Sequence, residues 1–283
     1  MEENRRRDLF FPILSSDLLM GPFLLTARLF TTGIFVFYIL DEIRAPHATS
    51  VLTYLAAAIQ FVGVILVALG YKTRFAALLL AFCIITRLLS NGSAGPAGVF
   101  MIHLLKDLAV AGGFLFMFAY GPGPLSVDGH RGGGKPRGME NDSQQSFFSP
   151  LLRSNIAIGL LLFAGRVLST VVFFYYGTSK ILHTSRMQAY MVAHNSHVPT
   201  NLIYLAILTQ IVPPALVLLG YKTRYGALAL AGFCIIATSL FHAEFGNHAE
   251  VEQFLLDFAI AGGLLFMFAC GPGPLSFDER ERR

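Results

Sequence analysis

Long apolar stretches alternate with short polar connections along most of the chain. Each stretch is about as long as an α-helix that crosses the hydrocarbon core of a bilayer, which takes roughly 17–25 residues. The pattern predicts an all-α, polytopic membrane protein with eight transmembrane helices. We place these helices at Phe23–Leu40, Val51–Leu69, Phe75–Leu89, Val99–Ala119, Ile156–Thr178, Leu202–Leu219, Tyr225–Phe241 and Phe254–Cys270.

Two stretches of sequence occur twice, and both pairs have the same separation. LGYKTR at 69–74 recurs at 219–224, and the longer segment at 111–128 recurs nearly unchanged at 261–278. Equal separations indicate a tandem duplication. Because each copy holds four predicted spans, the copies have the same orientation, and we expect two parallel four-helix bundle repeats.

The duplication divides the chain into two membrane units joined by a polar connection. The connection contains Gly132, Gly133, Gly134 and Pro136, a composition typical of flexible linkers. The expected parts are a cytoplasmic N-terminal tail (1–20), the first repeat (21–128), a flexible cytoplasmic linker (129–150), the second repeat (151–278) and a basic C-terminal tail (279–283).

The amino-acid composition agrees with a lipid environment. Of the 283 residues, 54% are hydrophobic and 13% are charged, whereas soluble domains carry about 25% charged residues. This balance argues against a water-soluble enzyme and predicts the lipid bilayer as the surrounding medium. The net charge of +4 belongs to loops beside the membrane, so we expect no nucleic-acid partner.

The basic residues indicate how the chain is oriented. With the N-terminus inside, most of the 21 lysines and arginines lie in the inner loops and tails, as at 5–7, 72–74 and 222–224. Cytoplasmic loops typically carry such an excess. We therefore expect a multi-pass protein of the inner (plasma) membrane with both termini cytoplasmic.

A set of motifs in the second half resembles a known family. Its first helix, within Gly165–Ile181, contains Arg166, and a Val-Pro step, the LGYKTR hairpin and a terminal GPGPLSFD follow. This set is similar to the DoxX family of integral membrane proteins. The first half matches the same pattern from Ala27 to Asp128, less faithfully.

The resemblance implies a role in redox metabolism. Some DoxX-like proteins resemble subunits of quinone-linked sulfur-oxidising complexes, and others occur in membrane complexes that handle thiol or oxidative stress. By this resemblance we expect a non-catalytic membrane subunit or anchor of such a complex, with a soluble or membrane oxidoreductase as partner. No covalently bound cofactor is expected, and quinone is the ligand that the resemblance allows. A small-solute or ion permease, a membrane scaffold or receptor, and assembly as a homo-oligomer are left open.

Two arginines fall inside predicted transmembrane helices. Arg28 and Arg166 each lie in the first helix of a repeat, and Arg166 is expected close to the bilayer midplane. An arginine at that depth costs at least about 2.5–3.5 kcal/mol on insertion scales, so it must face the bundle and find acceptors. Three roles are open: a clamp between helices, a site for an anionic or quinone-like head group, and a proton relay.

Further polar side chains complete a candidate binding cluster. Asp107 and Asp257 occupy equivalent positions in the last helix of each repeat, and Lys180 lies at a similar depth to Asp257. We expect Lys180 to reach Asp257, either as a structural ion pair or as part of a substrate or proton site. DoxX proteins often carry Glu in the second helix, where both copies here have Gln. The candidate binding cluster is Arg166, Lys180, Gln210, Asp257, Arg28, Gln60 and Asp107.

Histidines and glutamates before the last helix have side chains that bind divalent metals. Their spacing fits no helical metal-binding pair, and no regular element is expected to present them. We therefore expect a hydrated loop and no metal site, and the sequence identifies no catalytic residue. The group consists of His242, Glu244, His248, Glu250 and Glu252.

Overall fold

The computed structural model is all-helical over the residues that it describes, which are 17–44, 51–91, 97–131, 154–194, 199–242 and 245–280. No strand occurs among these residues, and each of the eight predicted spans falls within a helix. The helices are α3 (Asp17–Arg44), α4 (Val51–Leu69), α5 (Thr73–Asn91), α6 (Ala97–Tyr120), α7 (Val127–Arg131), α9 (Asn155–Leu182), α10 (Thr184–His194), α11 (Leu202–Leu219), α12 (Thr223–Phe241), α13 (His248–Cys270) and α14 (Phe277–Arg280).

Seven of the described helices are long and apolar enough to cross a membrane, namely α3, α4, α6, α9, α11, α12 and α13. The helix α5 is not among these seven. A helix is suited to lipid because it satisfies its backbone hydrogen bonds within one segment. The chain is therefore an integral membrane protein with several apolar spans.

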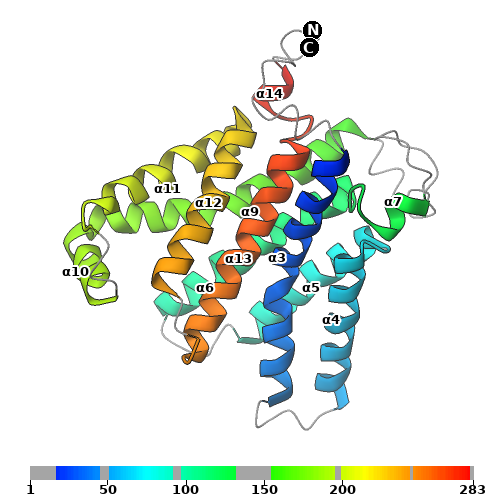
Figure 1. Cartoon of the computed structure of the whole chain (residues 1–283), viewed down its shortest axis with the longest axis horizontal. Coiled ribbons are helices and arrows are strands. Elements are labelled where there is room, and N and C mark those ends of the chain that lie inside the picture. The colour runs from blue at the N-terminus through cyan, green and yellow to red at the C-terminus, as the bar shows by residue number, and fades with distance from the viewer. Residues whose placement is uncertain are drawn as a thin grey trace.

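The helices do not separate into two four-helix bundles. The first long helix of the first half, α3, packs along α13, the last long helix of the second half, and α9 packs in the same way along α6. Contacts between α3 and α6, and between α9 and α13, are sparse. Figure 1 shows α3 and α13 side by side through the middle of the molecule. The two halves therefore form one packed body instead of the expected pair of separate bundles, because each half completes the packing of the other.

Glycines allow this exchange of helix partners. A Cβ placed on Gly112 of α6 would lie 2.5 Å from Ser169 Oγ of α9. A Cβ on Gly262 of α13 would lie 2.6 Å from the Ala27 carbonyl oxygen of α3. Small residues at such positions let helix backbones approach closely, so larger side chains would push these helices apart.

The buried core surrounds α6 and α13, and two helices contact it with only one narrow face. Phe114 and Phe116 of α6 and Phe266 of α13 are fully buried. In contrast, α4 and α11 expose large apolar side chains, among them Leu52 and Tyr204. In a bilayer these exposed apolar faces contact lipid, so α4 and α11 form part of the outer rim.

The LGYKTR hairpins and GPGPLS loops make the same contacts in both halves. Gly70 and Gly220 end α4 and α11 with φ angles of 69° and 72°, a left-handed conformation that glycine adopts without strain. The Asp128 carboxylate accepts two backbone amides at the start of α5, at 3.1 and 3.3 Å. Asp278 accepts the equivalent amides of α12 at 2.6 and 2.9 Å. The short helix after each GPGPLS loop, α7 or α14, therefore supplies the cap of the helix that follows the hairpin.

Parts of the predicted domain layout lie outside the described residues. The N-terminal tail is described from residue 17 onward, and the linker is described only through α7. The C-terminal tail is described through Arg280. The domain boundaries therefore stay predictions.

Candidate functional site

Arg28 and Arg166 are buried at the end of the molecule where the hairpins lie, with exposed fractions of 0% and 1%. Arg28 donates to the Leu125 carbonyl oxygen at 2.5 Å and to the Val67 carbonyl oxygen at 3.4 Å. Arg166 donates to the Leu275 carbonyl oxygen. Because Leu125 and Leu275 belong to the GPGPLS loops, each arginine ties the first helix of its half to the loop after the last helix.

These contacts show which groups Arg166 reaches. Side chains on a helix lean toward its N-terminus, and the guanidinium reaches the loop beyond the end of α13. Backbone carbonyls supply its acceptor, and the same holds for Arg28. The observed contacts are those of a clamp between helices and loops.

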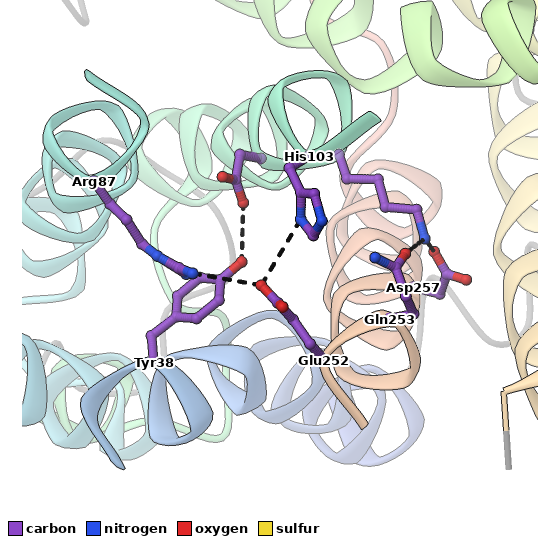
Figure 2. A network of polar contacts seen from close by, with 8 residues as sticks. Tyr38, Arg87, His103, Glu252, Gln253 and Asp257 are labelled. Carbon is purple, nitrogen blue, oxygen red and sulfur yellow. Dashed lines mark hydrogen bonds and ion pairs between the residues drawn. The ribbon is translucent and has the colours of Figure 1, made fainter. Parts of the chain in front are cut away.

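A first polar cluster lies toward the opposite end of the helices, between α3, α5, α6 and α13. Figure 2 shows Tyr38, Arg87, His103 and Glu252 converging there. Tyr38 Oη donates to Asp107 Oδ1 at 3.0 Å. Arg87 Nη2 lies 3.4 Å from Glu252 Oε1, and its guanidinium lies 3.3 Å from the centroid of the Tyr38 ring. His103 Nδ1 lies 3.8 Å from the same Glu252 oxygen, so these five side chains form one connected network.

A second polar cluster lies between α6, α9, α11 and α13. Lys106 Nζ lies 2.7 Å from Asp257 Oδ1, and Lys180 Nζ donates to Gln210 Oε1 at 2.9 Å. The Tyr176 ring centroid is 6.0 Å from Lys106 Nζ and 5.2 Å from Lys180 Nζ. The two lysines thus share one aromatic neighbour. The cluster comprises Lys106, Tyr176, Lys180, Gln210, Gln253 and Asp257, with Gln253 Oε1 accepting from Lys106 at 2.6 Å.

The partner of Asp257 differs from the one expected. Lys106 of α6 pairs with Asp257, whereas Lys180 bonds to Gln210. Lys106 cannot face its neighbour Asp107, because adjacent residues point away from each other on a helix. The packing of α6 against α13 gives Lys106 a partner on another helix instead.

The structure separates the seven predicted site residues into four groups. Lys180, Gln210 and Asp257 lie in the second polar cluster, and Asp107 lies in the first. Gln60 donates to Glu42 Oε2 at 3.1 Å, apart from both clusters. The two clamp arginines, Arg28 and Arg166, lie near the other end of the helices.

Several side chains of the two clusters were missed at the level of sequence, namely Tyr38, Arg87, His103, Lys106, Tyr176, Glu252 and Gln253. One signal was present, since His103, Lys106 and Asp107 follow the i, i+3, i+4 spacing of a single helix face. A polar face in an apolar helix indicates that it packs against protein. Glu252 was expected in a loop before the last helix, whereas α13 begins at His248 and places Glu252 in the helix.

Two histidines of the predicted loop group, His242 and His248, lie close to carboxylates. His242 Nδ1 lies 2.6 Å from Glu250 Oε2, and His248 Nε2 lies 3.4 Å from Asp41 Oδ1. Glu244 lies outside the described residues. Across the described part of the chain, no three His, Cys, Asp or Glu side chains come together in a way that could hold a metal ion.

The two polar clusters differ in their balance of charge. In the first cluster, Arg87 stands against the carboxylates of Asp107 and Glu252. In the second, Lys106 and Lys180 stand against Asp257 alone. The second cluster is therefore the better surrounding for carbonyl or anionic groups, because ammonium groups donate strong charge-assisted hydrogen bonds.

Comparison with known proteins gives matches in both halves of the chain. The DoxX family model matches residues 161–243, and the SURF4 family model matches residues 12–132. The inner membrane protein YqjF of Escherichia coli (strain K12) is 33% identical over 122 residues, which make up 43% of this chain and 91% of that relative. No solved structure matches the chain.

Proposed function

We propose, from the premise that this chain belongs to the DoxX family of integral membrane proteins, that it is a membrane subunit of a quinone-linked or thiol/sulfur redox complex. In this proposal it carries no redox group of its own. It binds a quinone-like head group at the second polar cluster and anchors an oxidoreductase partner that performs the electron transfer. The position of Lys180 in that cluster is the observation that supports the proposal.

Lys180 lies where a quinone carbonyl could meet a hydrogen-bond donor. Its side chain is half-buried near the end of α9, and its ammonium group bonds to Gln210 of α11. Since α11 exposes most of its apolar length, the group lies close to the lipid from which a quinone arrives. Tyr176 adds an aromatic face 5.2 Å from the ammonium group, against which a quinone ring could pack.

The same proposal treats the chain as two DoxX-like units in tandem. The caps made by Asp128 and Asp278, and the clamps made by Arg28 and Arg166, occur at equivalent positions in the two halves. The 122 aligned residues make up 91% of the E. coli relative, so that protein is less than half as long as this chain. That length suits a single unit. In this arrangement α5 is the eighth span.

The orientation is part of the proposal as well. With eight spans, both tails and both LGYKTR hairpins lie on one side of the membrane. Together with the connection between the halves (131–153), the tails and hairpins hold 14 of the 21 lysines and arginines, which favours the cytoplasmic side for them.

A permease is supported less well than a redox subunit. A Cβ on Gly113 of α6 would lie 2.7 Å from the Gly263 Cα of α13, so backbone fills the contact between these two helices. Glu252 and Asp257, which take part in the two ion pairs, are five residues apart on α13, so the pairs do not form a row along the helices. Neither feature marks a path for a solute.

The test is to purify the protein in mild detergent and to identify co-purifying quinones and proteins by mass spectrometry. The expected result is a bound quinone, together with an oxidoreductase. Lys180→Met should lower the quinone content about tenfold, which corresponds to roughly 1.4 kcal/mol of binding free energy. Arg186→Met, at an exposed position in α10, is the matched control and should retain the quinone.

Four results would contradict the proposal. If wild-type protein carried no quinone, quinone would not be the ligand. If Lys180→Met carried as much quinone as wild type, Lys180 would not be part of the binding site. Solute transport by the protein alone in liposomes would favour the permease. Recovery of partners that carry no redox group would favour a scaffold.

A further inference from the structure

We propose that the two halves of this chain are unlike partner units that recognise each other, and that each polar cluster is complete only when both halves are present. This inference concerns assembly and does not depend on a quinone. It rests on two observations. Helices of one half pair with helices of the other, and some charged residues of one half have no charged counterpart in the other half.

Each cluster receives a charged side chain from the other half. In the first polar cluster, Glu252 of α13 reaches Arg87 of α5 at 3.4 Å. In the second, Lys106 of α6 reaches Asp257 of α13 at 2.7 Å. The first half therefore gives a cation to the second half and takes a carboxylate from it.

The residues exchanged have no charged counterpart in the other copy. In the register that aligns 111–128 with 261–278, Lys106 corresponds to Leu256 and Glu252 corresponds to Ile102. Arg87, the partner of Glu252, corresponds to Ala237. The duplicated positions have thus diverged in complementary ways.

Pairs of like halves would leave charges without partners. In two copies of the second half, Glu252 would meet Ala237 in place of Arg87, and Asp257 would meet Leu256 in place of Lys106. Removing one member of a buried ion pair is strongly destabilising because the remaining charge is left in a medium of low dielectric constant.

Two copies of the first half would lack a charge pair as well. There Arg87 would meet Ile102, which carries no carboxylate. Only the pairing of a first half with a second half gives both Arg87 and Asp257 a partner of opposite charge.

The glycine contacts do not discriminate between like and unlike pairs. Gly112 and Gly262 make close contacts of the same kind with α9 and α3. Gly113 and Gly263 approach each other as equivalent residues. Because these close contacts are alike in both halves, they bring the halves together without setting the choice of partner, whereas the ion pairs occur only between unlike halves.

The experiment starts from the full chain with a protease site inserted between Gly134 and Lys135. The protein is purified in detergent, cleaved, and passed over a size-exclusion column. We expect the two halves to elute together in equal amounts after cleavage. When a tagged and an untagged cleaved preparation are mixed, capture of the tagged first half should recover second halves and at least tenfold fewer untagged first halves.

Charge reversal tests the role of the ion pairs. Glu252→Arg should reduce the fraction of halves that stay together, and the double variant R87E/E252R should restore it. Arg186→Glu changes a charge at an exposed position of α10 and should have no effect. Separation of the cleaved wild-type halves while the uncleaved chain stays monodisperse would overturn the inference. Equal recovery of like and unlike halves would overturn it as well.

Discussion

Gly113 and Gly263 bring the last long helix of each half into backbone contact. A Cβ built on Gly113 would lie 2.7 Å from the Gly263 Cα, and one built on Gly263 would lie 2.8 Å from the Gly113 Cα. Real Cβ atoms do not approach that closely, so glycine is required on both sides of the contact. The polar clusters lie on the same two helices, α6 and α13, and this contact therefore governs how the charges of the two halves meet.

Gly113→Ala should lower the melting temperature of the detergent-solubilised protein. The added methyl group forces α6 and α13 apart, and such overpacking typically costs about 1–3 kcal/mol. Gly232→Ala in α12 is the matched control, because a Cβ there has no neighbour within 4 Å. The melting temperatures are measured by fluorescence during heating. Equal values for the two variants would show that α6 and α13 are not in tight contact at Gly113.

Arg166→Leu and Arg28→Leu should each destabilise the protein, and by similar amounts. Each change removes charged hydrogen bonds to backbone carbonyls, which are worth about 1.5–3 kcal/mol. Arg186→Leu, at an exposed position of α10, should leave the free energy of unfolding within about 0.5 kcal/mol of wild type. A large loss of stability for only one of these two variants would mean that the equivalent contacts of Arg28 and Arg166 do not contribute equally to stability.

Tyr38→Phe should destabilise the first polar cluster. The change leaves the buried Asp107 carboxylate without the hydroxyl that donates to it at 3.0 Å, a loss of about 1–3 kcal/mol. Tyr204→Phe removes a hydroxyl from an exposed residue of α11 and should be neutral. Chemical unfolding of both variants in mixed micelles measures the difference, and no difference would place the Tyr38 hydroxyl outside the network.

Asp278→Ala should loosen the start of α12. The carboxylate accepts two backbone amides there, and loss of such a helix cap costs about 0.5–2 kcal/mol. Hydrogen exchange should become faster at the first turn of α12 and stay unchanged at the first turn of α5, which Asp128 caps. Unchanged hydrogen exchange at the first turn of α12 would show that the Asp278 cap does not stabilise that turn.

Cysteine labelling tests the proposed orientation. In a background without Cys83, Cys234 and Cys270, Lys222→Cys should react with an impermeant maleimide only after the membrane is opened. Arg186→Cys should react in intact cells, since Lys222 and Arg186 are exposed and lie near opposite ends of the long helices. The reverse pattern would place both tails outside.

Much of the fold follows from local sequence. Seven of the eight predicted spans coincide with described helices that are long and apolar enough to cross a membrane, and the bounds Val51–Leu69 and Leu202–Leu219 agree with α4 and α11 residue for residue. The hydropathy of a local segment is enough to predict a transmembrane helix, because a segment in lipid must satisfy its backbone hydrogen bonds internally. The start of α13 was placed too late because Glu250 and Glu252 suggested a loop, whereas interactions with His242 and Arg87 hold them in the helix.

The sequence by itself determined the medium, the helices and the duplicated hairpins. The tertiary structure alone decided that α3 pairs with α13 and α9 with α6, and hence that Lys106 rather than Lys180 meets Asp257. The physical reason is that lipid offers no hydrophobic preference for one apolar helix over another. Partners are then chosen by close backbone contact and by buried charge, and both depend on side chains that lie far apart in the sequence.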